Sequence, residues 1–247
     1  MDLFLIAPLA AALEAASGGL LWVADMIEPI AGTSAAAVAV VLVTLLVRAL
    51  LIPAGIAQAK AEQTRARLAP RLRDLQQRHR KDPERLRRET GRLYAEENAS
   101  PYGGCASLLV QAPVIGLLYA VFVHPSIAGH ANALLAANLS GVPLGVSPVG
   151  ALTSGTLSLP ACALFGGIVV SIVLVAEATR RLSPGADAVS SALTGPLRLI
   201  DLLPFSTAVV ATMVPLAAAI YLVVTVSWTL AQRVVLRRLY PPGTARG

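Results

Sequence analysis

The sequence predicts an all-α polytopic membrane protein, with five transmembrane helices and a cytoplasmic helical hairpin. Hydrophobic residues make up 55% of the 247 residues and the mean hydropathy is +0.68, which is too apolar for a soluble domain. Residues 1–47 and 101–179 contain no Lys or Arg. Twelve of the 20 basic residues lie in residues 60–92 beside five acidic ones, so this segment accounts for the formal net charge of +6.

The distribution of basic residues orients the chain. Cytoplasmic loops of membrane proteins are rich in Lys and Arg, and exported loops lack them. We therefore expect residues 57–99, 180–198 and 237–247 to be cytoplasmic and the amino terminus to lie outside. The abundance of Ala and the preference for Arg over Lys are typical of a GC-rich bacterial genome. The expected location is the bacterial plasma membrane, crossed several times.

The amino-terminal part divides into a surface segment and a first span. Residues 1–33 are expected to form an amphipathic segment on the outer surface, with Trp22 at the level of the lipid headgroups. Three acidic residues interrupt its apolar run: Glu14, Asp25 and Glu28. The first span covers residues 34–56, and Pro53 closes its apolar core.

Residues 57–99 are predicted to form an antiparallel helical hairpin. Asp82 can cap the second arm and Pro83 can occupy its first helical position. Leucines recur along both arms at spacings of three, four and seven residues: Leu68, Leu72, Leu75, Leu86 and Leu93. This spacing predicts a coiled-coil seam between the arms.

Four further spans follow the hairpin. They are expected at residues 104–124, 158–179, 199–214 and 215–236. The outer loop, residues 125–157, is rich in Gly, Pro, Ser and Ala, and a short helix is expected near residues 131–139. Pro215 predicts a hinge between the last two spans. Glu177 precedes Arg180 and Arg181 by three and four residues, which predicts a local ion pair.

Arg48 is the main candidate for a functional residue, because an ionisable side chain inside an apolar run is costly. Two interpretations stay open. The guanidinium could reach the headgroups by snorkelling, or it could face a wet cavity inside the bundle. Thr44 lies four residues before Arg48 and Gly55 seven after it, so all three share one helical face. This stripe of polar and small residues favours the cavity.

Two further polar residues are candidates for the same cavity. Gln111 lies in the second predicted span between apolar neighbours, where an interhelical hydrogen bond is the alternative. Tyr221 and Trp228 are seven residues apart in the last span and share a face; packing is the alternative for both.

No catalytic, metal or cofactor site is expected. Cys105 and Cys162 are far apart in apolar stretches and are interpreted as packing residues. The sequence contains no GxxxxGK[ST] phosphate loop, and none of its histidines lies near an intramembrane nucleophile. An intramembrane enzyme is therefore disfavoured.

The basic hairpin is a candidate contact surface. Its charge suits anionic lipid headgroups or nucleic acid phosphate, and a merely solvated hairpin is the alternative. The residues expected to make the contact, or to recruit partners, are Arg71, Arg73, Arg78, Arg85, Arg87 and Arg88.

Several stretches resemble the YidC-type membrane protein insertases of the Oxa/Alb superfamily, in their short form without a large outer domain. The resemblance covers about residues 35–240. The stretches that carry it are Leu93 to Cys105, Leu108 to Pro113, Leu118-Tyr119, Val47-Arg48 with Pro53, Leu68 to Pro70, Leu203 to Phe205, and Pro215 to Tyr221. The chain departs from the family pattern at Ser107, Leu222 and Val226.

The resemblance implies a hydrophilic groove between five helices, open to the cytoplasm and to lipid. Arg48, Thr44, Gln111 and Tyr221 would line this groove. The implied partners are nascent membrane proteins and anionic lipids, together with the ribosome, the signal recognition machinery and the general secretory channel. A channel or small-solute transporter with Arg48 as an anion site is the alternative function, and a purely structural scaffold is a third.

Overall fold

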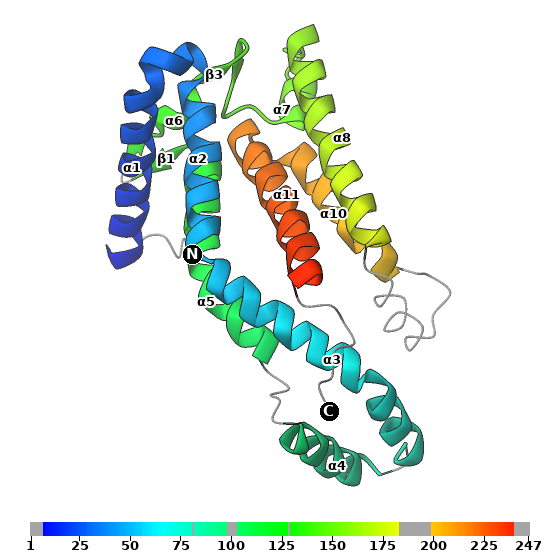
Figure 1. Ribbon diagram of the computed structural model, residues 1–247. Helices are drawn as coiled ribbons and strands as arrows, with labels where there is room; N and C mark the ends of the chain where they lie inside the picture. Colours follow the sequence, from blue (N-terminus) through cyan, green and yellow to red (C-terminus); the bar gives the residue numbers. More distant parts are fainter. Residues whose placement is uncertain (1–6, 81, 98–102, 128, 183–198, 240–247) are drawn as a thin grey trace. The chain divides into compact units, whose positions relative to one another are not determined.

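The computed structural model describes the chain except residues 1–6, 81, 98–102, 128, 183–198 and 240–247 (Figure 1). It divides into two compact units. Unit 1 comprises residues 1–49 and 114–231, and unit 2 comprises residues 50–113 and 232–247. The predicted cytoplasmic loop 180–198 and tail 237–247 fall largely outside the described residues.

Long apolar helices dominate the chain. Their bounds are α1 Ala7–Ala31, α2 Ala35–Leu50, α5 Gly103–Val123, α8 Leu159–Arg181, α10 Leu199–Met213 and α11 Leu216–Leu239. Within the described residues, three stretches are long and apolar enough to cross a membrane: Ala10–Leu50, Leu159–Arg181 and Leu216–Leu236. Ala112–Val123 is a shorter apolar helix. The chain is therefore a polytopic membrane protein built from helices, as predicted.

The first predicted span, residues 34–56, contains a break between two helices. The helix ends at Leu50 and a new one, α3 (Ile52–Arg78), begins two residues later. Pro53 sits in the first turn of α3, where its missing N–H is tolerated. Residues 52–56 belong to the same helix as the first arm of the hairpin, and the membrane boundary of the first span stays a prediction.

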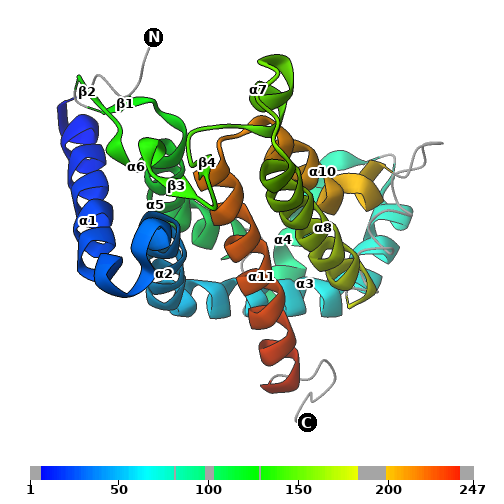
Figure 2. The same cartoon turned by 90° about the horizontal axis from the view of Figure 1, so that it is seen from above.

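The amino-terminal segment is one continuous helix that continues through the short 3-10 helix η2 (Gly32–Ser34) into α2. Leu13 and Leu20 of α1 are buried in the same core as Ala36 and Val40 of α2. Both views show α1 running beside α2 (Figures 1 and 2). Trp22 remains 63% exposed, on a face of α1 that the protein leaves uncovered.

The segment 125–157 contains local structure that the sequence analysis predicted only in part. Of the short helix expected near residues 131–139, four residues are helical, α6 (Ala133–Ala136). The two antiparallel pairs of short strands were not predicted. Their bounds are β1 Ser126–Ile127 with β2 His130–Ala131, and β3 Asn138–Leu139 with β4 Val142–Pro143. Ser140 and Gly141 join β3 to β4 with φ of 53° and 81°, as a two-residue hairpin turn requires.

Asn132 ties this segment to the end of α5. Its side-chain amide donates to the carbonyl oxygens of Val121 (2.7 Å) and His124 (3.0 Å), and its Oδ1 accepts from the N–H of Leu134. The side chain is 6% exposed, so these bonds are shielded from water. Asn132 thereby caps two helices at once, α5 at its carboxyl end and α6 at its amino end.

Replacing Asn132 with alanine is expected to destabilise unit 1 by about 2 kcal/mol, because two carbonyl oxygens lose their partner in a buried place. Thermal unfolding in detergent measures the effect. Asn138→Ala is the matched control, since Asn138 is exposed. Equal melting temperatures for the two variants would contradict this role of Asn132.

The last two helices meet at the predicted hinge. α10 ends at Met213 and α11 begins at Leu216, with Pro215 between them. The first amides of α11 donate to carbonyl oxygens of the segment 125–157, Leu216 N to Val146 O (2.9 Å) and Ala217 N to Leu144 O (3.0 Å). The hinge prediction is confirmed, and the segment 125–157 supplies hydrogen-bond acceptors to the first amides of α11.

α8 and α10 pack side by side in unit 1 (Figures 1 and 2). Their contact buries Ile172, Ala208 and Ala211. At the end of α8, Glu177 forms the predicted ion pairs, with Arg180 (2.8 Å) and Arg181 (2.7 Å).

The packing role predicted for Cys162 is wrong, because its side chain is exposed on α8. The side chain of Cys105 lies outside the described residues.

Unit 2 contains the predicted helical hairpin, formed by α3 and α4 (Pro83–Glu96). Asp82 caps α4 by accepting from Arg85 N at 3.0 Å, and Pro83 occupies its first turn, as predicted. Leu68, Leu93 and Tyr94 are buried between the arms, and two further leucines of the predicted seam pack against them. Leu86 is half-buried and lies outside this cluster.

Replacing Leu68 with alanine is expected to loosen the hairpin by about 3 kcal/mol, since Leu68 is 1% exposed and its removal leaves a cavity. Amide hydrogen exchange in α3 and α4 should accelerate. Leu86→Ala is the control, with a smaller expected effect. If both substitutions accelerate exchange equally, Leu68 is not the centre of the hairpin core.

Candidate functional site

Arg48 lies in the last turn of α2, inside the apolar stretch Ala10–Leu50. Its side chain is half-buried. It forms no ion pair with any residue in the part of the chain that the structure describes. A guanidinium carries five N–H donors, so Arg48 offers several donors that no acidic group of these residues takes.

The structure places Tyr221 of α11 next to Arg48. The Arg48 guanidinium and the Thr225 hydroxyl both lie near enough to the phenol of Tyr221 to interact with it. The geometry stops short of a hydrogen bond, because the hydroxyl oxygens of Tyr221 and Thr225 are buried without a hydrogen-bond partner among the described residues. Two of the predicted site residues, Arg48 and Tyr221, are thus brought together from different helices.

Packing fixes the ring of Tyr221. Its centroid lies 5.6 Å from that of Phe122 and 6.5 Å from that of Tyr119, both on α5, with tilted planes. Tyr221 is 3% exposed and Phe122 is fully buried. Such tilted aromatic contacts are favourable beyond the area that they bury. The phenol oxygen therefore has a fixed direction.

Thr44 shares the face of Arg48 but has its hydroxyl already engaged. Its Oγ1 donates to the carbonyl oxygen of Val40, one turn earlier in α2, at 2.6 Å. The side chain is 1% exposed. Thr44 is therefore a packed and satisfied residue of α2, and its hydroxyl is not free to donate elsewhere.

Gln111, the remaining predicted site residue, lies on α5 within unit 2, whereas Arg48 and Tyr221 belong to unit 1. Its side chain lies outside the described residues. Its place in a shared site with Arg48 stays a prediction.

Thr225 is the residue that the sequence analysis missed. It follows Tyr221 by four residues on α11, so helical geometry alone places both on one face. That spacing was available in the sequence, but a threonine in an apolar helix usually bonds to its own backbone and gives no signal.

In unit 2, Gln232 of α11 lies over Gly55 of α3. A side chain at Gly55 would collide with the Gln232 amide, whose Cδ lies 2.9 Å from the place of a Cβ. The Nε2 of Gln232 is buried with no hydrogen-bond partner in the described residues. The small residue at 55 therefore serves a close approach of two helices.

The arginines predicted to contact lipid are engaged to different degrees. Arg71 bonds to Glu97 at 2.8 Å, together with Arg67, and Arg78 bonds to Asp74 at 2.7 Å. Arg88 lies 3.8 Å from Glu84. Arg73, Arg85 and Arg87 are exposed. Within the described residues, Arg85 and Arg87 form no ion pair, so the second arm offers the most available positive charge.

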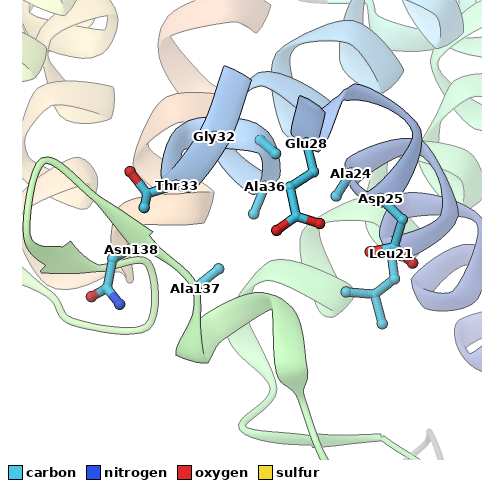
Figure 3. A pocket seen from close by; sticks show the side chains of 10 residues that line it. Leu21, Ala24, Asp25, Glu28, Gly32, Thr33, Ala36, Ala137 and Asn138 are labelled. Carbon is cyan, nitrogen blue, oxygen red and sulfur yellow. The ribbon is translucent and has the colours of Figure 1, made fainter. Parts of the chain in front are cut away.

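Unit 1 also contains a pocket of about 300 Å³ that the sequence analysis did not predict (Figure 3). It lies between the end of α1, η2, the start of α2 and the segment around Asn138. Asp25, Glu28, Thr33 and Asn138 supply its polar groups. Both carboxylates are exposed. The described residues contain no group of three or more side chains suited to hold a metal ion.

The comparisons with known proteins agree on one family. The family model described as "60Kd inner membrane protein" matches residues 26–243. Proteins named "Membrane protein insertase YidC" are similar over a shorter stretch. The one from Clostridium perfringens (strain 13 / Type A) is 38% identical over 85 residues, and that from Clostridium tetani (strain Massachusetts / E88) is 35% identical over 85. The one from Enterococcus faecalis (strain ATCC 700802 / V583) is 43% identical over 86.

The similar stretch covers about a third of each chain. It is 34%, 34% and 33% of this chain and 36%, 39% and 31% of the three relatives, in the same order. The family model, in contrast, extends over nearly the whole sequence, including Arg48, the hairpin and Tyr221. The chain therefore belongs to the 60Kd inner membrane protein family, the YidC-type membrane protein insertases that its sequence resembles.

Proposed function

We propose that this protein inserts transmembrane segments into the membrane and helps them to fold. The observation that carries the proposal is the half-buried guanidinium of Arg48, which lies beside Tyr221 in an apolar stretch of a chain of this family and has no ion-pair partner among the described residues. An ionisable group in such a place is costly unless it has a task. Arg48 and Tyr221 would line a hydrophilic groove, and Thr44 would support it through packing.

The acidic or polar leading segment of an arriving substrate would rest near Arg48. Two opposite charges 4 Å apart attract by about 4 kcal/mol at an effective dielectric constant near 20, which offsets much of the cost of burying a carboxylate. The contact is transient, because the carboxylate is better hydrated once it has left the membrane.

Partitioning would drive the release. A substrate helix of about 20 apolar residues gains a few tenths of a kcal/mol per residue on entering the bilayer. A membrane potential adds about 2.3 kcal/mol per 100 mV for each negative charge moved outward. Insertion by this route requires no nucleotide hydrolysis and no cofactor.

The hairpin would act at the cytoplasmic surface. The exposed arginines of its second arm suit anionic lipid headgroups, since each basic residue near such a surface contributes about 1 kcal/mol. The proposed topology has five spans, the amino terminus outside and the carboxyl terminus cytoplasmic. Nascent membrane proteins are the proposed partners, and the ribosome, the signal recognition machinery and the secretory channel are candidates for recruitment.

Reconstitution into liposomes separates this function from its main alternative, a channel or transporter. The purified protein should increase the insertion of a single-spanning substrate with an acidic amino-terminal tail above that in empty liposomes. Anion flux should stay at the level of empty liposomes. Anion flux that does not depend on substrate, with no gain in insertion, would overturn the proposal in favour of the channel.

A further inference from the structure

Two hydroxyls on one face of α11 are buried without a hydrogen-bond partner among the described residues: Tyr221 Oη and Thr225 Oγ1. They are four residues apart, so about 6 Å of helix separates their Cα atoms. The Arg48 guanidinium lies beside the first of them. All three groups belong to unit 1.

Thr225 lacks the hydrogen bond that most of the described helical threonines make. Six of them donate to a carbonyl oxygen of their own helix at 2.6 to 3.1 Å: Thr44, Thr64, Thr153, Thr179, Thr212 and Thr229. Such a bond is the usual way for a threonine to satisfy its hydroxyl in an apolar helix. Thr225 does not use it, and a buried hydroxyl without a partner destabilises the protein.

The hydroxyl of Tyr221 is also buried without a hydrogen-bond partner among the described residues. The residue is 3% exposed and its ring packs against those of Phe122 and Tyr119, so the phenol cannot turn to a new partner without breaking those contacts. Arg48, Tyr221 and Thr225 therefore form a set of neighbouring donors. A guanidinium can only donate, and the two hydroxyls can donate as well. The set is complementary to oxygen acceptors.

We propose that Tyr221 and Thr225, together with Arg48, form a receptor for main-chain carbonyl oxygens of an entering segment that is not yet helical. The inference rests on the proposed insertase function and names what the site recognises. Unpaired carbonyls are costly in the membrane interior, so a segment needs donors there until it winds into a helix. When the segment forms a helix, each carbonyl oxygen accepts a hydrogen bond from an N–H of the segment itself, and the segment leaves the receptor.

A carboxylate presents the same oxygen chemistry, so the test must separate the two sources. Two single-spanning substrates are used, one with an acidic leading tail and one with Asn and Gln in place of its Asp and Glu. The double variant Tyr221→Phe/Thr225→Val keeps both shapes and removes both hydroxyls. Thr229→Val is the matched control, because the Thr229 hydroxyl is satisfied at 2.8 Å one turn further along α11.

The double variant should slow insertion of both substrates by about fivefold, as expected for the loss of two neutral hydrogen bonds. Thr229→Val should leave the rates unchanged.

A second experiment changes the substrate. A main-chain amide of its leading segment is replaced by an ester, whose carbonyl is a weaker acceptor. This replacement should slow insertion by the wild type and have less effect in the double variant, because the two changes act on one contact. An ester in the last turn of the segment is the control.

Two results would overturn the receptor. One is a double variant that slows only the acidic substrate, which would assign the hydroxyls to carboxylates. The other is a double variant as fast as Thr229→Val. Either can occur while the wild type still inserts both substrates, so the proposed function would stand. Failure of the wild type to insert any substrate would instead overturn the function itself.

Discussion

Replacing Arg48 with alanine is expected to slow the insertion of a substrate with an acidic leading tail by about thirtyfold. The estimate takes about 2 kcal/mol for the loss of a charge-assisted contact, at about 1.4 kcal/mol per factor of ten. Arg48 has no ion-pair partner among the described residues, so its removal leaves no acidic group of theirs unpaired. The fold should therefore survive. Insertion rates into proteoliposomes measure the effect.

Arg48→Lys and a neutral tail make this result specific. Lysine restores the positive charge but not the planar arrangement of N–H donors of a guanidinium. Full recovery of the insertion rate would assign the role to charge, and partial recovery would assign part of it to donor geometry. The neutral-tailed substrate should lose less than the acidic one in Arg48→Ala. An alanine variant that inserts the acidic substrate at the wild-type rate would remove Arg48 from the mechanism.

Replacing Tyr221 with alanine is expected to destabilise the protein by about 4 kcal/mol. The residue is 3% exposed and contacts the rings of Phe122 and Tyr119, so its truncation leaves a large cavity in the core of unit 1. The midpoint of thermal unfolding in detergent should fall by several degrees. Insertion should also decrease, through the loss of both the ring and the hydroxyl.

Two matched variants separate these contributions. Tyr221→Phe keeps the ring and should unfold close to the wild-type temperature while it inserts more slowly. Tyr119→Ala removes a ring that is only half-buried and should destabilise less than Tyr221→Ala. Were Tyr221→Ala as stable as the wild type, the tyrosine would not be part of the core.

The local rules of helix formation predicted the parts of the fold that depend on neighbouring residues. Asp82 and Pro83 begin α4 as their types require, and Pro215 separates α10 from α11. The long apolar runs gave the helices of the membrane part, because the backbone must satisfy itself there. Apolar composition alone did not reveal the helix break at Leu51 inside the first predicted span.

Features that depend on contacts between distant residues could not be predicted in this way. The short strands contain two residues each, too few for an alternating pattern. Arg71 finds Glu97 across the hairpin, 26 residues away, which no spacing rule along one helix anticipates. The site was predicted in part: Arg48 was conspicuous as a charge, whereas Thr225 matters only because its hydroxyl lacks the usual bond.

The accessibility of position 48 tests the central claim most directly. A single cysteine at position 48, in an otherwise cysteine-free protein in liposomes, should react with a membrane-impermeant maleimide and crosslink to the leading segment of a stalled substrate. A cysteine at Val40, which is fully buried, should do neither. A position 48 that resists the reagent and never crosslinks to the substrate would contradict the account.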